Sequence, residues 1–571
     1  MFSRRIFLFN NIASLAVAAT YRCFADIYEL ASAIDRYNFY DDCSDANNLF
    51  NNNEECDIAQ IYGWPMNSWC VENVTDMSNL FRYRRDFNED ISDWDVSGVT
   101  TMDQMFKSAE SFNGDISKWD TLSVTNMGGM FWGASSFNCD LNKWNTSSVT
   151  DMGNMFLEAA AFNGNVNNLD VSNVKKMWSM FRGAMSFNGD ISKWNVSGLR
   201  DMLRMFEGAT SFNADLSNWD TSGVYSMRRM FLDATLFNGN VSTWDTSGLS
   251  DAREMFSQAR SFHQDLSNWN TTGVKYMANM FKNATSFNSD LSKWNTSSAI
   301  GMGSMFYLAK SFNSDLSKWN TSSVTNMFGM FRYATSFNSD LSNWNTSRVT
   351  HMQYMFNGAT SFDSDLSKWN TARVTDIKHM FHDAIAFNSD LSKWDISSLT
   401  SMMWTFYNAS SFNQNLCAWG DMIMQEGFYF IDTFRYSNCT FEDNPLLEQG
   451  GPFCASSCMT ALDTSKPTNQ PISNTASPNQ VSSTSHPEYF NDTSSQTETM
   501  PNLFTKNSST PASSPPTSQP SPIATTRDQI SNQPSSDIII LNSSARSTRS
   551  KTNLHRVIVS LALLIGRAIS F

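Results

Sequence analysis

A 25-residue repeat constrains this 571-residue chain more than any other feature, and it runs without insertion or deletion through residues 75–419. Phe occupies all fourteen positions at this interval from Phe81 to Phe406, and a second unbroken Phe column runs from Phe87 to Phe412. Trp recurs in step from Trp69 to Trp419, with only Leu169 interrupting. Self-similarity at a fixed period of this length predicts stacked repeats, so we expect a solenoid.

Each unit divides into a helical pattern, a turn and a short extended piece. In the unit around residue 105, the apolar residues have the i, i+3, i+4, i+7 spacing of one helix face: Met102, Met105, Phe106 and Ala109. Thr100 or Thr101 can cap this helix. Phe112–Asp115 has turn composition, and residues Trp119–Thr121 are expected to form a short strand.

A single 25-residue unit cannot bury so many large side chains, whereas stacked units can cover one another. The sequence therefore predicts an α/β repeat solenoid of about fourteen units. Each unit is expected to contribute one short strand and one short helix, with the strands stacked in parallel and Phe, Met and Trp inside. Burying each large apolar side chain contributes on the order of 1.5–3 kcal/mol, so this core needs no metal.

The repeating unit, as in Val324–Ser347, closely resembles that of the BspA-like leucine-rich-repeat surface proteins. More narrowly, it is similar to their 25-residue subfamily, first noted in mycoplasma lipoproteins and left without an assigned activity. The resemblance covers about residues 66–420. It implies a leucine-rich-repeat-like right-handed superhelix on a cell surface, with adhesion as the usual suggestion for relatives. It implies no catalytic residues.

The segments outside the repeat predict export and tethering. Residues 1–25 have the basic start and apolar run of a signal peptide, with cleavage sites at Val17–Ala19 or Cys23–Ala25. Residues 26–74 and 420–462 are expected to be N- and C-terminal caps. Residues 463–541 are rich in Ser, Thr and Pro and predict an extended stalk. Residues 542–571 fit a GPI-anchor signal attached at Asn542 or Ser543, with a short transmembrane anchor as the alternative.

Cysteine placement also favours an oxidising, extracellular location. With cleavage after Ala25, Cys23 leaves with the signal peptide and Cys139 stands alone in the repeat. A zinc site at Cys454 and Cys458 is the less favoured alternative. The disulfide candidates lie on either side of the repeat: Cys43, Cys56, Cys70, Cys417, Cys439, Cys454 and Cys458.

Charge and motifs argue against nucleic-acid binding and catalysis. The net charge is −15, which disfavours phosphate backbones. No catalytic motif occurs, so we expect neither enzyme activity nor a cofactor. His379, His382 and Asp383 could share a helix face and hold a metal, but surface histidines are the simpler interpretation. A column of Asp from Asp90 onward could bind calcium, yet turn capping explains it better, because Asn substitutes at three positions.

The residue after each Trp is polar and is expected to point outward. Together these residues are expected to form a polar stripe along the solenoid. The candidate ligand stripe is Asn270, Asn295, Asn320, Asn345 and Asn370. Its partner would be an extracellular protein or polysaccharide; a merely soluble surface is the alternative. N-glycosylation sequons begin at Asn73, Asn145, Asn195, Asn240, Asn270, Asn283, Asn295, Asn320, Asn345, Asn408 and Asn438.

These features together predict a monomeric binding or adhesion protein of the cell surface, or a secreted one. The alternative is a structural component of an extracellular coat or wall, in which the rod self-assembles and recognises nothing specific.

Overall fold

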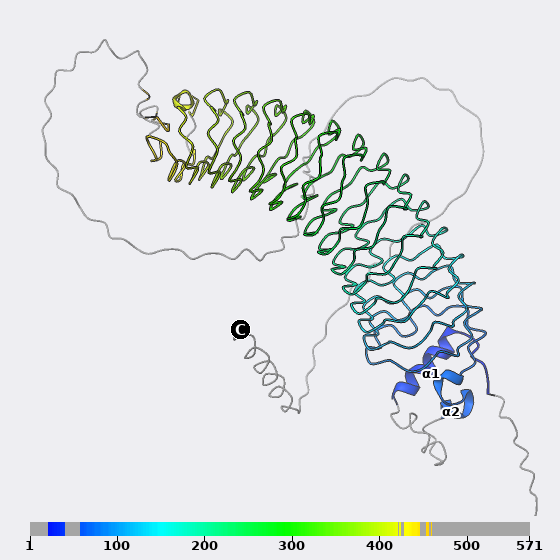
Figure 1. Cartoon of the computed structure of the whole chain (residues 1–571). Helices are drawn as coiled ribbons and strands as arrows, with labels where there is room; N and C mark the ends of the chain where they lie inside the picture. Colours follow the sequence, from blue (N-terminus) through cyan, green and yellow to red (C-terminus); the bar gives the residue numbers. More distant parts are fainter. Residues whose placement is uncertain are drawn as a thin grey trace, which may run out of the picture. The chain divides into compact units, whose positions relative to one another are not determined.

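A computed structural model describes residues 21–39, 57–420, 422–423, 428–445, 451, 453–455 and 458. All belong to the first of two compact units, Met1–Asn469. The expected stalk and anchor lie outside the described residues, as does most of the expected signal peptide. Helices occur only near the two ends of this part (Figure 1): α1 (Ile27–Phe39), α2 (Asp57–Tyr62) and the 3-10 turns η4 (Met66–Ser68) and η5 (Cys417–Trp419). Neither α1 nor α2 is long and apolar enough to cross a membrane.

Units of 25 residues form successive coils that lie side by side, which confirms the repeat architecture (Figure 1). One parallel backbone bridge joins most neighbouring coils, as between Thr101 and Asn126, and the bridges extend from Asp76 to Tyr429. The expected parallel pairing therefore exists. It amounts to a single residue per coil, not a strand.

The expected helix over residues 102–109 is absent, and the chain runs through consecutive turns there. Gln104 and Ser108 have φ angles of 54° and 56°, in the left-handed region that interrupts an α-helix. Alternate backbone N–H groups donate to the next coil, as Gln104 does to the Gly128 carbonyl at 2.8 Å. The N–H groups between them, such as that of Met105, donate to the carbonyl three residues earlier in the same coil. The helical burial pattern was correctly identified, but its hydrogen bonds cross between coils.

The expected strand over Trp119–Thr121 is also wrong, because side chains make the contacts between coils at this point. The indole N–H of Trp119 donates to the Ile91 carbonyl of the preceding coil at 3.1 Å. The hydroxyl of Thr121 donates to the Asn145 carbonyl of the following coil at 2.9 Å. Trp recurs at this position because it fills the core and also satisfies a buried carbonyl.

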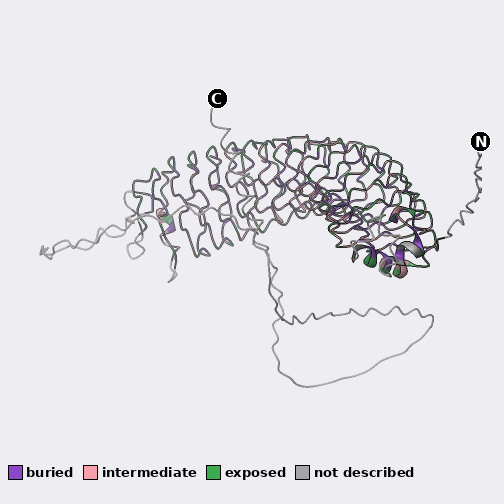
Figure 2. Ribbon diagram, turned by 90° about the horizontal axis from the view of Figure 1, so that it is seen from below, coloured by how far each residue is buried: buried purple, intermediate pink, exposed green. Residues whose placement is uncertain are grey.

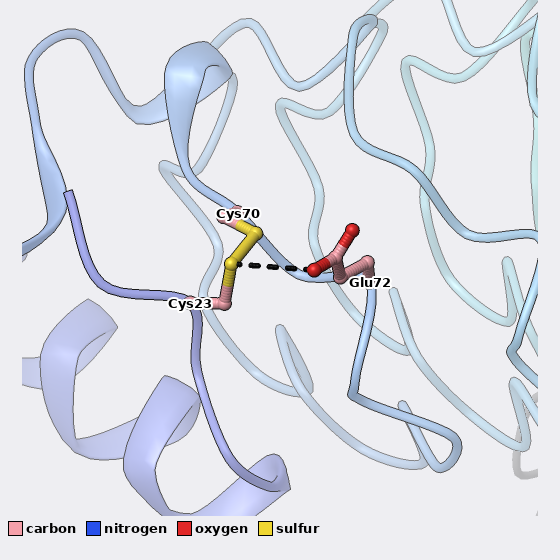
Figure 3. A group of neighbouring side chains, drawn as sticks. All are labelled: Cys23, Cys70 and Glu72. Carbon is pink, nitrogen blue, oxygen red and sulfur yellow. Dashed lines mark hydrogen bonds between the residues drawn. A yellow bond between two sulfur atoms is a disulfide. The ribbon is translucent and has the colours of Figure 1, made fainter. Parts of the chain in front are cut away.

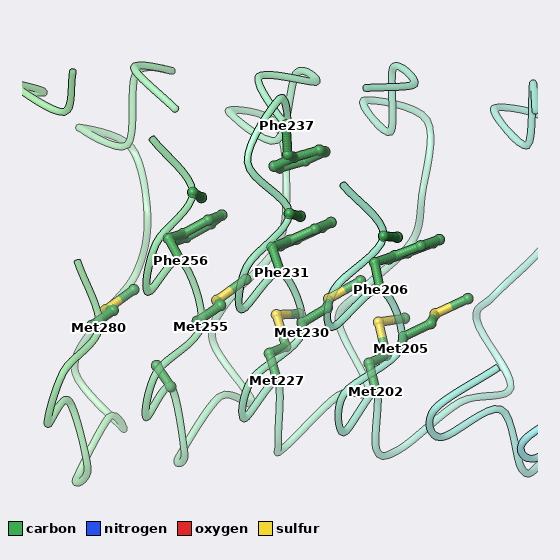
Figure 4. Packing of buried hydrophobic residues seen from close by; sticks show 14 of the residues in the cluster. Met202, Met205, Phe206, Met227, Met230, Phe231, Phe237, Met255, Phe256 and Met280 are labelled. Carbon is green, nitrogen blue, oxygen red and sulfur yellow. The ribbon is translucent and has the colours of Figure 1, made fainter. Parts of the chain in front are cut away.

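The Phe, Met and Trp columns form one continuous core. Figure 4 shows Phe and Met side chains of neighbouring coils packed in this core, and Figure 2 colours the ribbon by burial. Phe206 stacks on Phe231 of the next coil with ring centroids 5.6 Å apart, and on Phe212 of its own coil at 4.0 Å. Met202 and Met205 beside them are completely buried. The flexible thioether side chains fill the gaps between these flat rings. The expected core is confirmed column by column.

The N-terminal end of the core is covered by α1, α2 and the segment before them. Phe24 is fully buried and stacks on Tyr62 with ring centroids 4.0 Å apart. Cys23 forms a disulfide with Cys70 (Figure 3). Cys23, which would leave with a signal peptide cleaved after Ala25, is thus a disulfide partner in the described fold. Removal of residues 1–25 would break this bond and take Phe24 out of the core.

Two further disulfides close the C-terminal end: Cys417–Cys458 and Cys439–Cys454. They confirm these four cysteines as disulfide partners, so the zinc alternative for Cys454 and Cys458 is wrong. The side chain of Phe434 continues the Phe column beyond the last regular coil, 5.5 Å from Phe406. Cys43 and Cys56 lie outside the described residues. Cys139 is a free thiol, as its isolated position suggested.

Candidate functional surface

The candidate stripe lies on the outside of the coils, as expected. Trp294 is 3% exposed whereas Asn295 is exposed, and the same alternation holds along the stripe. Each stripe amide, however, also has an intramolecular role. The Oδ1 atom of Asn295 accepts the backbone N–H of Ser297 at 3.1 Å. Equivalent bonds of 3.0–3.2 Å form at Asn270, Asn320, Asn345 and Asn370. The oxygens cap turns, so a ligand would meet the amide N–H groups.

The sequons divide into exposed and partly buried sites. Asn240, Asn283 and Asn408 are only partly exposed. The Nδ2 atom of Asn408, to which a glycan would attach, donates to Asp383 at 2.7 Å. A glycan there would replace one of the two Nδ2 hydrogens and crowd this contact. The exposed sequon residues are Asn73, Asn145, Asn195, Asn270, Asn295, Asn320, Asn345 and Asn438.

The Asp column caps turns. Oδ1 of Asp290 accepts the N–H of Ser292 at 2.9 Å, and the two serine hydrogen bonds lower the pKa of the Asp290 carboxyl. Asn165 and Asn240 make the equivalent contact, which explains why Asn substitutes in this column. Lys293 and Lys318 lower the pKa of Asp290 further through their positive charges. This geometry supports the turn-capping interpretation.

The two histidines take part in a ladder of aromatic rings. His379 lies between Tyr354 and Trp404, with ring centroids 4.7 and 4.8 Å away. Burial lowers the pKa of His379 to about 3, so the ring is neutral at physiological pH. His382 Nδ1 lies 2.9 Å from Asp383 Oδ2. These residues are partly buried, which corrects the expectation of plain surface histidines.

Within the described residues, one group of three potential metal ligands comes together: Cys23, Cys70 and Glu72. The two sulfur atoms are joined to each other, so neither is a free thiolate (Figure 3). Glu72 Oε1 lies 3.5 Å from Cys23 Sγ, but a disulfide sulfur has no proton to donate. The group is a structural disulfide with a neighbouring carboxylate.

A second surface escaped the sequence analysis. We number each coil from its bridge residue, which is residue one. The second surface consists of the third, fourth, seventh and eighth residues of each coil, and we call it the variable face. In the coil that begins at Ser226 these are Arg228, Arg229, Leu232 and Asp233. Most of its side chains are partly exposed. The sequence contains a signal for this face. The residue types in these four columns change from coil to coil, whereas the core columns between them hardly change.

The variable face differs in chemistry along the stack. Toward the C-terminal end it is aromatic, and the guanidinium of Arg332 lies over the rings of Tyr307, Tyr333 and Tyr354 at 4.7–5.3 Å. Toward the middle it is charged, with ion pairs such as Arg229–Glu254 at 3.0 Å. The backbone beneath repeats regularly, so one scaffold presents different side chains at different heights.

Regular coils, a closed aromatic core and changing outer side chains define a repeat protein with units of about 25 residues. The family model described as "Mycoplasma protein of unknown function, DUF285" matches residues 44–169, 136–238, 214–318 and 303–419. These matches span more than half of the chain, so the chain belongs to this family. No curated protein matches it.

Proposed function

We propose that this is a binding protein of the cell surface, which holds a rigid stack of coils outside the cell and recognises an extracellular protein or polysaccharide. The observation that carries the proposal is the contrast between core columns that hardly change and an outer face that changes at every coil. Constant columns are sufficient to hold the stack together. Side chains that vary on a constant backbone are the arrangement with which repeat proteins bind partners.

The caps favour a monomer over the alternative of a self-assembling coat. An exposed end coil would present unpaired backbone groups and bare Phe rings to a second copy. At the N-terminal end Phe24 is buried and Cys23 is bonded to Cys70. At the other end Phe434 and Phe453 are completely buried. End-to-end stacking would require opening these caps.

Export and tethering remain part of the proposal. The packing of residues 22–25 favours the earlier cleavage site, after Ala19, because it leaves Cys23 and Phe24 in the mature chain. We further propose that the family is related to the BspA-like leucine-rich-repeat proteins through its right-handed superhelix. Catalysis plays no part in this proposal.

Binding of the intact secreted chain to a panel of glycans and matrix proteins tests the proposal. We expect saturable binding by a monomer. Concentration-dependent polymerisation without any ligand, and no binding, would support the coat. Replacing Asn295, Asn320 and Asn345 together by Gln tests the stripe against an enzymatically deglycosylated control. If both proteins bind normally, the stripe is only a soluble surface.

Tethering has its own test. Phosphatidylinositol-specific phospholipase should release the protein from the surface of expressing cells. Persistence on the membrane, with the peptide 557–571 still attached, would indicate a short transmembrane anchor.

A further inference from the structure

Four arginines gather on the variable face where three neighbouring coils meet, and we call them the arginine cluster: Arg182, Arg204, Arg228 and Arg229. Backbone bonds hold two of these coils in register, since the Arg204 N–H donates to the Arg228 carbonyl at 3.0 Å. All four side chains are partly exposed. The cluster is thus fixed by the stack itself and open to solvent.

Nearby carboxylates do not neutralise the cluster. Glu207 is shared, with Oε1 3.1 Å from Arg182 Nε and Oε2 3.5 Å from Arg204 Nε. Glu254 pairs with Arg229 at 3.0 Å. Arg253, the next arginine along the face, forms its own ion pair with Asp251 at 2.6 Å, and the two charges balance. The four guanidinium groups of the cluster therefore form ion pairs with only two carboxylates, those of Glu207 and Glu254.

Arg228 is the arginine without a partner. Its side chain makes no hydrogen bond or ion pair with any described residue, and its Nε atom is buried without a hydrogen-bond partner. The electrostatics of Arg204 agree with an excess of positive charge. Burial lowers the pKa of Arg204, and the neighbouring Arg229, Arg182 and Arg228 lower it further against the opposing effect of Glu207. An incoming anion would relieve this repulsion.

We propose that the arginine cluster binds an oxyanion group, the sulfate or carboxylate of an acidic polysaccharide. Guanidinium groups bind such oxyanions through paired, charge-assisted hydrogen bonds. The proposal rests on the proposed function and names its ligand class. The net charge of −15 belongs to the whole chain and does not prevent a local positive site.

The coil spacing argues against an extended acidic peptide as the ligand. Phe rings beneath the cluster repeat every 5.6–5.7 Å from Phe181 to Phe231. An extended peptide presents side chains on one face only about every 6.7 Å, because successive residues point to opposite sides. Acidic peptide side chains would therefore fall out of step with the coils.

Binding of the intact chain to dextran sulfate, with neutral dextran, polygalacturonate and polyglutamate as comparisons, tests the proposal. We expect salt-sensitive binding to dextran sulfate or polygalacturonate and none to dextran. The two acidic polysaccharides distinguish sulfate from carboxylate. Arg228→Gln should weaken binding by about tenfold or more. Its melting temperature should not fall, since Arg228 has no ionic partner to lose.

The matched control is Arg85→Gln. It makes the same charge change at a remote arginine whose side chain is 69% exposed and pairs with Glu110. We expect it to change affinity less than about twofold. Equal losses in both variants, or no loss with Arg228→Gln, would overturn the site. Tightest binding to polyglutamate would overturn the ligand class. Binding of another ligand on the panel, without any acidic polysaccharide, would overturn this inference and leave the proposed function standing.

Discussion

The buried columns and the variable face belong to the same coils, yet they differ in how they use their residues. At the Phe231 position the same ring recurs in every coil, stacked on both neighbours at 5.6 Å. Two residues before it, at Arg229, the corresponding residue is Ser179, Arg204, Glu254 or Tyr354 in other coils. Core packing accepts only Phe at the Phe231 position, whereas the Arg229 position accepts many residue types. Stability and recognition can therefore be changed separately in this molecule.

The largest expected effect is on the core. Trp294→Ala should destabilise the chain by about 3–5 kcal/mol, because it leaves a cavity and an unpaired Leu266 carbonyl, to which the indole donates at 3.0 Å. Trp294→Leu should cost less, since Leu169 occupies the equivalent position in another coil. Urea unfolding measures both. Equal stability of wild type and Trp294→Ala would mean that the column does not hold the stack together.

The N-terminal cap should show the next largest effect. Replacing Cys23 and Cys70 together by Ser should destabilise the cap by about 2–4 kcal/mol, because the disulfide restricts the unfolded chain. Thermal unfolding with and without reductant measures this. Cys139→Ser is the matched control and should change little, since Cys139 is a free, half-buried thiol. A mature chain that begins after Ala25 would contradict the role of Cys23.

Acid should weaken the turns at the edges of the coils. Serine hydrogen bonds lower the pKa of carboxyls such as Asp115, Asp290 and Asp315, so the folded chain binds these protons less readily than the unfolded chain does. Their contribution is present above the unfolded pKa of about 3.9 and is lost as the pH falls below it. Melting temperatures should stay level down to about pH 5 and fall below about pH 4. A fall already between pH 7 and 5 would point to other groups.

The smallest effects are expected on the outside. Asn295→Ala should cost at most about 1 kcal/mol, the loss of one turn cap to Ser297. Arg228→Gln should change stability by less than about 0.5 kcal/mol, because its side chain has no partner among the described residues. Chemical denaturation of the two variants side by side measures the difference. A larger loss from Arg228→Gln than from Asn295→Ala would show that the variable face also supports the fold.

The core was predictable from the sequence, while the backbone was not. Met102, Met105, Phe106 and Ala109 are all buried as their spacing predicts. The same spacing arises in a helix and in this chain of turns, so it could not distinguish them. What distinguishes them is the left-handed conformation at Gln104 and Ser108, residues with no strong preference for it. Glycines at the equivalent positions in other coils hint at it: Gly129, Gly133, Gly183, Gly208, Gly329 and Gly358.

The candidate stripe shows a different limit. Its outward direction followed from alternation with Trp294, and exposure of Asn295 confirms it. Its second role as a turn cap was visible for the Asp column but was not extended to these Asn residues. The arginine cluster was missed because its members come from three coils and three different columns, so no periodicity brings them together.

The most direct test of the division between core and variable face is a crystal structure of the intact chain with a short acidic oligosaccharide. We expect ligand density over Arg204 and Arg228, with the Phe and Trp columns undisturbed. Density along Asn295, Asn320 and Asn345 instead, with the arginine cluster empty, would contradict it.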